Sequence, residues 1–295
     1  MIIHQIVFDA TQKSMRLNDF IQEQFTSFLP SKSSVKKAFK KKLILLNNRA
    51  ALIGDSLCTG DVVALREDVS FKNKVFPLDL PILFEDQDIA LITKPAGFSV
   101  SGNFFKTIQN AIPHNLSKST KKDALSVPRP VHRLDKLTSG ILLVAKTHSA
   151  QISLGKQFED QEIHKTYYAL VKGKLSGTGV FNASIDGQVA VTNFNSVRVE
   201  KSLSYDWVSL IELNPITGRT HQLRIHLAHA GHPIIGDYLH DSSNVLKGKG
   251  LFLSSSKIGF KHPISQNYKT FEIPIPTKYV SLFERELRRW NKFNS

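Results

Sequence analysis

A single aspartate stands among basic residues in the segment 131–140, which reads VHRLDKLTSG. Asp135 has Arg133 two residues before it, and the apolar run 141–145 follows. The apolar run predicts a buried strand, so Asp135 would lie on a loop that a rigid sheet holds in place. There it could act on a substrate as a nucleophile or as a base. The alternative is a turn aspartate that hydrogen bonds to its own backbone near Thr138.

A second segment whose residue types could take part in catalysis spans residues 215–233 and reads PITGRTHQLRIHLAHAGHP. Its apolar spacing predicts a helix that Thr220 caps and that Gly231 ends. Arg224 would project from the first two turns of this helix, where its neighbours hold it in place. An arginine in that position beside Asp135 would keep the carboxylate charged and oriented.

The histidines of the second segment suggest a metal site, but their spacing argues against one. They do not form the pair on one helix face that zinc hydrolases use, and no nearby glutamate could act as the base. We therefore expect no metal and predict solvated or phosphate-facing imidazoles instead. The four histidines are His221, His226, His229 and His232.

Other enzyme classes lack their usual residues. Hydrolysis of a glycosidic bond normally uses two carboxylates, and neither segment offers Asp135 an acidic partner. The sequence also contains no serine elbow, no phosphate-binding glycine loop and no dinucleotide fingerprint. The residues alone thus indicate a nucleic-acid-facing enzyme or binding protein with one aspartate among arginines.

The overall charge is compatible with a polyanionic partner. The 295 residues include 39 Lys plus Arg against 25 Asp plus Glu, a net charge of +14. Such a surplus is found in nucleic-acid-binding proteins and also in proteins that are simply well solvated. The lone Cys58 allows no internal disulfide, and neither an export signal nor a membrane-spanning run is visible. We therefore expect a cytoplasmic protein that does not enter a membrane.

The basic residues are densest in the segment 31–42, which contains six lysines and no acidic residue. Helical spacing places Val35, Ala38 and Phe39 on one stripe and the lysines away from it. The lysine face would contact RNA phosphates or would merely be solvated. The candidate phosphate ligands are Lys32, Lys36, Lys37, Lys40 and Lys41.

The elements that must position these residues fall into two parts. Residues 1–70 are predicted to form a small unit with helices at 17–28 and 31–42 and strands at 43–46 and 62–65. Residues 71–80 read as a linker, and 81–295 as a larger domain with a hairpin at 84–93. Because its strands lack regular intervening helices, we predict the α+β class. Its other expected elements are strands at 141–145, 166–171, 196–200, 207–213, 251–253 and 271–275, a helix at 278–290, and exposed loops at 113–128 and 241–250.

Three motifs of the larger domain resemble those of the RluA-type RNA pseudouridine synthases. Residues 132–140 resemble the family's catalytic-aspartate motif, and 165–171 resemble the motif that carries an active-site tyrosine, here Tyr167. Residues 217–237 resemble the motif whose arginine, here Arg224, pairs with the catalytic aspartate. Weaker similarity extends from about residue 80 to 276. Residues 1–70 resemble the RNA-binding module named after ribosomal protein S-four.

The resemblance implies a fold and a reaction. The fold would be a mixed, largely antiparallel sheet with flanking helices, and the reaction the isomerisation of uridine to pseudouridine in ribosomal or transfer RNA. Asp135 would act at the sugar, Arg224 would hold it charged, and Tyr167 would stack on the base and could shuttle a proton. Arg133, Thr138, Arg219 and His221 would hold the flipped nucleotide. No cofactor or metal is implied, and we expect a monomer.

Two other functions remain open at this point. The chain could be a non-catalytic RNA-binding or ribosome-assembly factor that kept the fold, although such a protein has no need of Asp135, Tyr167 and Arg224 together. A nucleoside or glycoside hydrolase is disfavoured because the second carboxylate is missing.

Overall fold

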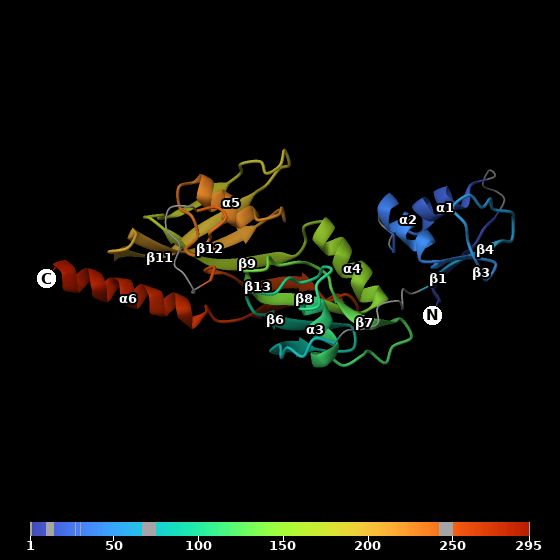
Figure 1. The fold of residues 1–295 in the computed structure, drawn as a ribbon, viewed down its shortest axis with the longest axis horizontal. Coiled ribbons are helices and arrows are strands. Elements are labelled where there is room, and N and C mark those ends of the chain that lie inside the picture. The colour runs from blue at the N-terminus through green and yellow to red at the C-terminus, as the bar shows by residue number, and fades with distance from the viewer. Residues whose placement is uncertain are drawn as a thin grey trace.

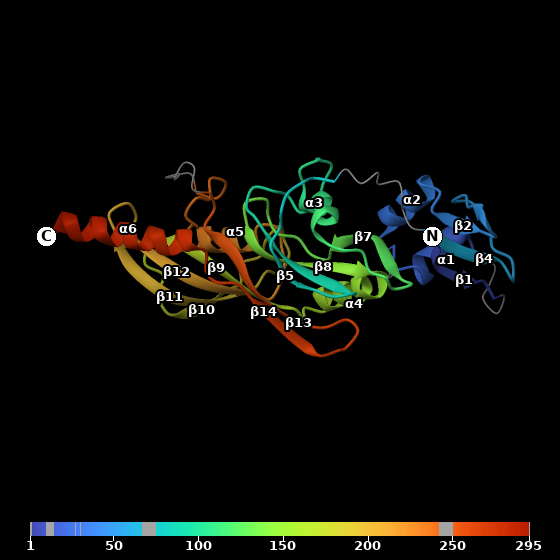
Figure 2. The ribbon, with the colours of Figure 1, turned by 90° about the horizontal axis from the view of Figure 1, so that it is seen from below.

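The computed structural model describes residues 2–9, 15–26, 28–29, 31–66, 75–241 and 250–294 of the chain. In these ranges the chain forms two β-sheets with helices packed against them, which confirms the α+β class. The N-terminal sheet and the C-terminal helix lie at opposite ends of the molecule (Figures 1 and 2). Residues 71–74 of the predicted linker and most of the loop at 241–250 lie outside the described residues.

The N-terminal sheet has four antiparallel strands in the order β1-β4-β2-β3. Two helices pack against it, and its core is formed by N-terminal residues such as Leu17, Phe25 and Val63. The predicted helices are confirmed, although the first ends at Gln24. The first strand was not predicted. The elements are β1 (Ile2–Val7), α1 (Leu17–Gln24), α2 (Lys32–Lys40), β2 (Ile44–Leu46), β3 (Arg49–Ala50) and β4 (Val62–Arg66).

The second sheet has ten strands, and its main path runs β10-β11-β12-β9-β13-β8-β6-β5, with β14 paired to β13 and β7 to β8. Among the described strand pairs only β8 with β13 is parallel, so the sheet is largely antiparallel as predicted. The strands are β5 (Ile82–Glu85), β6 (Ile89–Lys94), β7 (Ala124–Pro130), β8 (Ser139–Thr147), β9 (His164–Lys172), β10 (Thr178–Phe181), β11 (Thr192–Ser202), β12 (Asp206–Pro215), β13 (Leu253–Lys261) and β14 (Tyr268–Glu272).

The central stretch 141–145 of β8 is apolar because both faces of the strand are covered. Leu142 and Val144 belong to one core cluster, whereas Ile141 and Leu143 belong to another. Helix α3 (Ile108–Asn115) contributes to the first cluster and α4 (His148–Glu159) to the second. The two helices lie on opposite sides of the sheet (Figures 1 and 2). The loop that precedes β8 is therefore attached to one of the best-buried strands of the described chain.

The expected loop at 113–128 is partly wrong. It contains the end of α3 and most of β7. Strand β7 contains Pro128 and Pro130, which a sheet tolerates on an edge strand, and β7 pairs only with β8. Helix α4 was also missed, because its polar and small residues give little apolar periodicity. Its start is marked by Thr147, whose hydroxyl accepts a hydrogen bond from the Ala150 amide.

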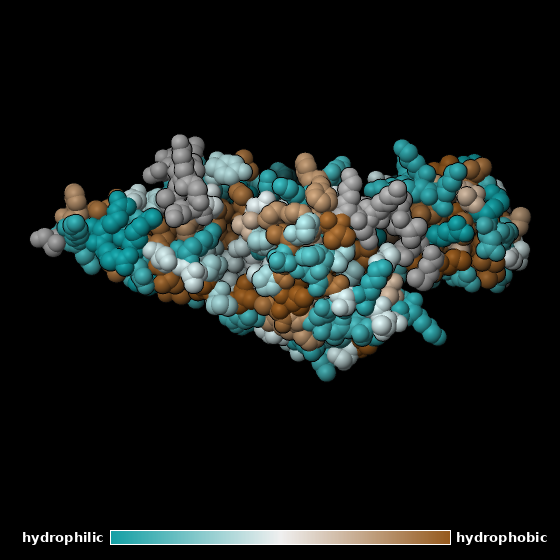
Figure 3. Space-filling model, turned by 60° about the horizontal axis from the view of Figure 1, so that its bottom comes forward, coloured by the Kyte–Doolittle hydropathy of each residue, from teal (hydrophilic) through white to brown (hydrophobic). Residues whose placement is uncertain are grey.

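The C-terminal helix α6 (Thr277–Asn294) confirms the predicted helix at 278–290. It buries Tyr279, Leu282 and Phe283 and packs against β11. The surface at this end of the molecule is largely hydrophilic (Figure 3). Within the described residues, no helix combines the length and apolarity needed to cross a bilayer.

Candidate active site

Asp135 lies on the loop that joins β7 to β8. The turn is closed by the Thr138 amide, which donates to the main-chain carbonyl of Asp135 (3.1 Å) and not to its carboxylate. The carboxylate is directed instead to Arg224, with Oδ2 3.7 Å from Nη1, and to His221, with Oδ1 4.0 Å from Nε2. These contacts argue against the alternative of a self-bonded turn aspartate.

Asp135 borders a cavity of about 270 Å³. Five parts of the chain line it: the segment before β8, the end of α4 at Phe158, the start of β9, the loop from β12 into the helix α5 (Gln222–His229), and the start of β13 at Leu253. Among the described residues that line this cavity, Asp135 is the only acidic one. The structure thus gathers around one cavity Asp135, Tyr167, Arg224, Arg133, Thr138, Arg219 and His221.

Arg224 makes its two-point contact with a different carboxylate from the one expected. Its Nε and Nη2 donate to Oδ2 and Oδ1 of Asp237, both at 2.7 Å, whereas only Nη1 faces Asp135. Both partners of this fork are buried, at 4% and 1% side-chain exposure. Burial alone would raise the pKa of Asp237, but the hydrogen bonds and charge of Arg224 hold it below its ordinary value. Arg224 thus faces Asp135 as expected but is not held by it: Asp237 fixes the guanidinium, which presents its remaining nitrogen to Asp135.

The start of α5 also differs from the prediction. The residue at the cap position is His221, in the left-handed conformation (φ 55°), and no side chain caps the helix, so Thr220 is not the cap. The side chain of Gln222, the first residue of the helix, bonds to the preceding loop and to β11. Its Oε1 accepts from the Thr217 hydroxyl (2.7 Å) and the Arg219 amide (3.0 Å), and its Nε2 donates to the Val191 carbonyl (3.0 Å). These bonds hold the loop that brings His221 to Asp135.

Tyr167 lies on β9 with its side chain toward the cavity and 9% exposed. Burial raises the pKa of its phenol to about 12; a hydrogen bond with the Ser255 side chain lowers it, and the Asp135 charge raises it. The phenol is therefore protonated at neutral pH. Tyr168 faces the other side of the strand, where its hydroxyl lies 3.0 Å from Glu212.

Lys94, at the end of β6, was not predicted as a site residue. Its side chain is fully buried, and its Nζ donates to the carbonyls of Thr138 (2.6 Å), Pro95 (3.1 Å) and Lys136 (3.3 Å). Burial lowers its pKa to about 8, and the nearby Asp135 charge opposes this. Lys94 thus ties β6 to the loop that carries Asp135. The Lys-Pro-Ala-Gly run at 94–97 was a visible signal for it.

Replacement of Lys94 is expected to change how stability depends on pH. The unfolded lysine has a pKa near 10.4 and the folded one near 8, so the unfolded state binds more protons between these values. Relative to Lys94→Met, the wild-type free energy of unfolding should therefore rise by about 3 kcal/mol between pH 8 and 10.4. Urea unfolding of both proteins across this range measures it. A constant difference would show that Lys94 titrates normally.

The remaining predicted RNA contacts differ in exposure. Arg133 and Arg219 are exposed at the cavity, and Arg219 also donates from Nε to the Val189 carbonyl (3.0 Å). Thr138 is buried, and its hydroxyl has no hydrogen-bond partner among the described residues. The α2 lysines do not line the cavity. Of these lysines, Lys32, Lys36, Lys37 and Lys40 are exposed, and Lys41 is half-buried.

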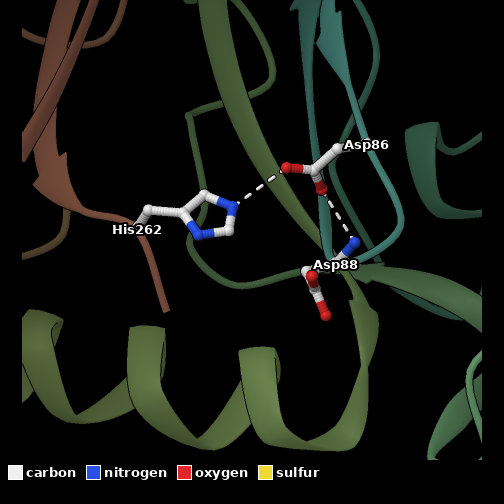
Figure 4. A group of neighbouring side chains, drawn as sticks. All are labelled: Asp86, Asp88 and His262. Atoms are coloured by element: carbon white, nitrogen blue, oxygen red, sulfur yellow. Dashed lines mark hydrogen bonds and ion pairs between the residues drawn. The ribbon is translucent and has the colours of Figure 1, made fainter. Parts of the chain in front are cut away.

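A separate cluster of Asp86, Asp88 and His262 has the residue types of a metal site (Figure 4). Its ligand atoms are already engaged. His262 Nε2 lies 2.9 Å from Asp86, its Nδ1 accepts main-chain amides, and Asp88 pairs with Lys121. The Asp86 carboxylate also accepts the amides of Asp88 and Ile89. The cluster therefore joins the β5–β6 turn to the β13–β14 turn and offers no argument for an ion.

Comparison with known proteins agrees with the three motifs. The family model described as RNA pseudouridylate synthase matches residues 88–229. The chain is 30% identical to an uncharacterized RNA pseudouridine synthase, YlyB, of Bacillus subtilis (95% of this chain, 96% of the relative). It is 32% identical to the ribosomal large subunit pseudouridine synthase D of Xylella fastidiosa (92% of each).

Similarity to solved structures supports the fold. The human RNA pseudouridylate synthase domain containing 4 superposes with a TM-score of 0.56 at 24% identity, over 70% of this chain and 93% of that one. The sequence relatives cover nearly the whole chain at 30% identity or more, so they establish the family. The chain belongs to the RluA-type RNA pseudouridine synthases and is an isomerase that acts on RNA.

Proposed function

We propose that this enzyme converts uridine to pseudouridine in RNA of the large ribosomal subunit, with Asp135 as the catalytic group. The observation that carries the proposal is a cavity whose only acidic lining residue in the described chain faces Arg224 at 3.7 Å. One carboxylate suits an isomerisation, whereas glycosidic hydrolysis normally needs two. The choice of ribosomal RNA is supported by relatives that are named ribosomal large subunit pseudouridine synthases C and D.

The proposed reaction is internally balanced. Asp135 acts at the ribose, either by attack on C1′ or by removal of the C2′ proton, and the bond from C1′ to N1 of uracil breaks. The base rotates within the cavity and C5 bonds to C1′; this step releases the Asp135 carboxylate from C1′ or is accompanied by return of the proton to C2′. The hydrogen on C5 is then lost as a proton, and N1 gains a proton. Tyr167 remains protonated under the rotating base because burial raises its pKa to about 12. The target uridine must leave its stack to reach Asp135, which costs a few kcal/mol unless it already lies in a loop.

Residues 1–70 are proposed as an S-four-like RNA-binding module, 71–80 as the linker and 81–295 as the catalytic domain. The separate sheet and core of the N-terminal part support this division. The exposed lysines on α2 would bind the RNA backbone. A monomer in the cytoplasm remains our prediction.

Pseudouridine mapping tests the substrate. Ribosomal and transfer RNA from cells with and without this protein would be mapped, together with cells that carry Asp135→Ala. We expect specific uridines of the large-subunit RNA to lose modification in both altered strains. A loss confined to transfer RNA would overturn the ribosomal substrate. Normal modification with Asp135→Ala would overturn the catalytic assignment and favour the non-catalytic assembly factor.

Deletion of residues 1–70 is expected to weaken RNA binding and to make it less sensitive to salt. Each lost phosphate contact reduces the slope of log affinity against log salt concentration by about 0.7 to 0.9. Titration of RNA into the full and truncated proteins at several KCl concentrations measures both quantities. An unchanged slope would show that the α2 lysines are only a solvated surface.

A further inference from the structure

Lys165 lies in the active-site cavity, and the proposed reaction gives it no task. It precedes Tyr167 by two residues on β9, so both side chains belong to the same face of the strand, about 7 Å apart. Both line the cavity that Asp135 borders. Residues Thr166 and Tyr168, on the other face, bond to Asn214 and Glu212.

The surroundings of Lys165 are neutral. Its Nζ lies 5.9 Å from the centre of the Phe158 ring, and Phe158 stacks on His132 with ring centres 5.0 Å apart. His132 Nε2 accepts the Leu143 amide (3.0 Å), and burial, followed by the Lys165 charge, lowers its pKa to about 3. The imidazole is therefore uncharged at neutral pH. Lys165 is the cation on an otherwise neutral aromatic wall of the cavity.

Comparable lysines in the described chain have oxygen partners. Lys94 donates to three carbonyls, Lys146 pairs with Glu85, and Lys278 donates to the Leu251 carbonyl. Within the described residues, Lys165 has neither a carboxylate nor a carbonyl partner. Burial lowers its pKa, so the charge bears a desolvation cost, and its contact among the described residues is the Phe158 ring and not an oxygen atom. An ammonium group in these surroundings is suited to bind an anionic ligand that enters the cavity.

We propose that Lys165 binds a backbone phosphate of the RNA next to the uridine held over Tyr167. The inference rests on the proposed function for the identity of the ligand. In a uridine at this site the base is neutral, and the charge resides on the phosphates that flank it. A base positioned between Tyr167 and Asp135 leaves the flanking backbone to follow the cavity wall toward Lys165. The phosphate would supply the oxygen partner that Lys165 lacks, and it would fix the direction in which the strand enters the cavity.

The test compares Lys165→Met with Lys269→Met. Lys269 also lies over a phenylalanine ring, with Nζ 5.1 Å from the centre of Phe84, but it does not line the cavity. Binding of an RNA hairpin with loop uridines would be measured at several KCl concentrations. For Lys165→Met we expect about ten-fold weaker binding and a salt slope shallower by about 0.7, with KM raised more than kcat is lowered. Lys269→Met should match the wild type.

Neutral methylphosphonates, introduced one at a time along the hairpin, locate the contact. A methylphosphonate at one position should weaken RNA binding by the wild type about ten-fold and leave RNA binding by Lys165→Met unchanged. The same methylphosphonate should again weaken binding by Lys165→Arg, because arginine restores the positive charge. Additive losses at every position would overturn the proposal. The proposal would also be overturned if Lys165→Met kept the wild-type salt slope but had a reduced kcat, because Lys165 would then contact the uracil and not a phosphate. If Lys165→Met does not fold, Lys165→Gln replaces it in the same comparison.

The binding measurements do not depend on turnover. Wild-type protein that shows the single phosphate contact but forms no pseudouridine would contradict the proposed function and leave Lys165 as a phosphate ligand. Pseudouridine formation without that contact would contradict only the assignment of Lys165.

Discussion

Replacement of Asp135 by asparagine is expected to abolish pseudouridine formation while RNA affinity stays within a few-fold of the wild type. Asparagine keeps the size of the side chain but can neither attack the sugar nor remove its proton. Because Asp135 is the only acidic lining residue in the described chain, no neighbouring carboxylate can substitute for it. We expect kcat to fall at least about 10⁴-fold, as when other enzymes lose their reacting group.

Single-turnover formation of pseudouridine and RNA titration measure these two quantities separately. Glu212→Gln is the matched control, because Glu212 contacts Tyr168 on the strand face that points away from the cavity. It should leave turnover within a few-fold of the wild type. Turnover by Asp135→Asn comparable with that of the control would remove Asp135 from the chemistry.

Arg224→Lys is expected to reduce both stability and activity. The guanidinium uses two nitrogens for Asp237 and turns the third toward Asp135, and a lysine has only one nitrogen to place. Asp237 is 1% exposed, so a lost or poorly matched partner leaves a buried charge uncompensated. Removal of one partner of such a pair lowers the free energy of unfolding by about 3–5 kcal/mol. Because lysine keeps the positive charge, Arg224→Lys should lower it by an amount near the smaller of these values. Turnover should fall about 100-fold, because Asp135 loses its facing cation.

Urea unfolding and single-turnover rates test this prediction together. The control is Arg219→Lys, since Arg219 is an exposed arginine at the same cavity whose only described side-chain hydrogen bond goes to the Val189 carbonyl. Its stability should change by no more than about 0.5 kcal/mol. Arg224→Lys with wild-type stability and near-wild-type turnover would refute the role of the Asp237 fork.

The fold was predictable where short-range patterns carry the information. The apolar run 141–145 identified the central strand β8, and the helix predicted at 278–290 is α6. The buried face of α6 contains Tyr279, Leu282 and Phe283, whereas Val280 is exposed. Helix α4 and strand β7 were not predicted from the sequence, because their local signals are weak and tertiary contacts determine their structure. A proline-containing segment becomes a strand only where an edge of the sheet is free to accept it.

The site was predictable as a set of residues but not as a set of contacts. The three motifs indicated Asp135, Tyr167 and Arg224, which the structure brings to one cavity. They did not indicate that Asp237 takes the two-point contact of Arg224, because sequence separation does not show which of two carboxylates lies in the plane of the guanidinium. Lys94 was overlooked for a related reason. Its partners are main-chain carbonyls, which every residue has, so no residue type reveals them.

The sequence alone determined the class of the protein and the residue types of its chemistry: one aspartate with arginines near it, and strands without regular helices between them. The tertiary structure decided which charge neutralises which. Lys94 is bound by carbonyls and Arg224 by Asp237, whereas Lys165 lies over the Phe158 ring without an oxygen partner in the described chain. The reason is physical: a charge pair depends on distances of a few ångströms and on burial, and both arise only when segments distant in sequence pack together.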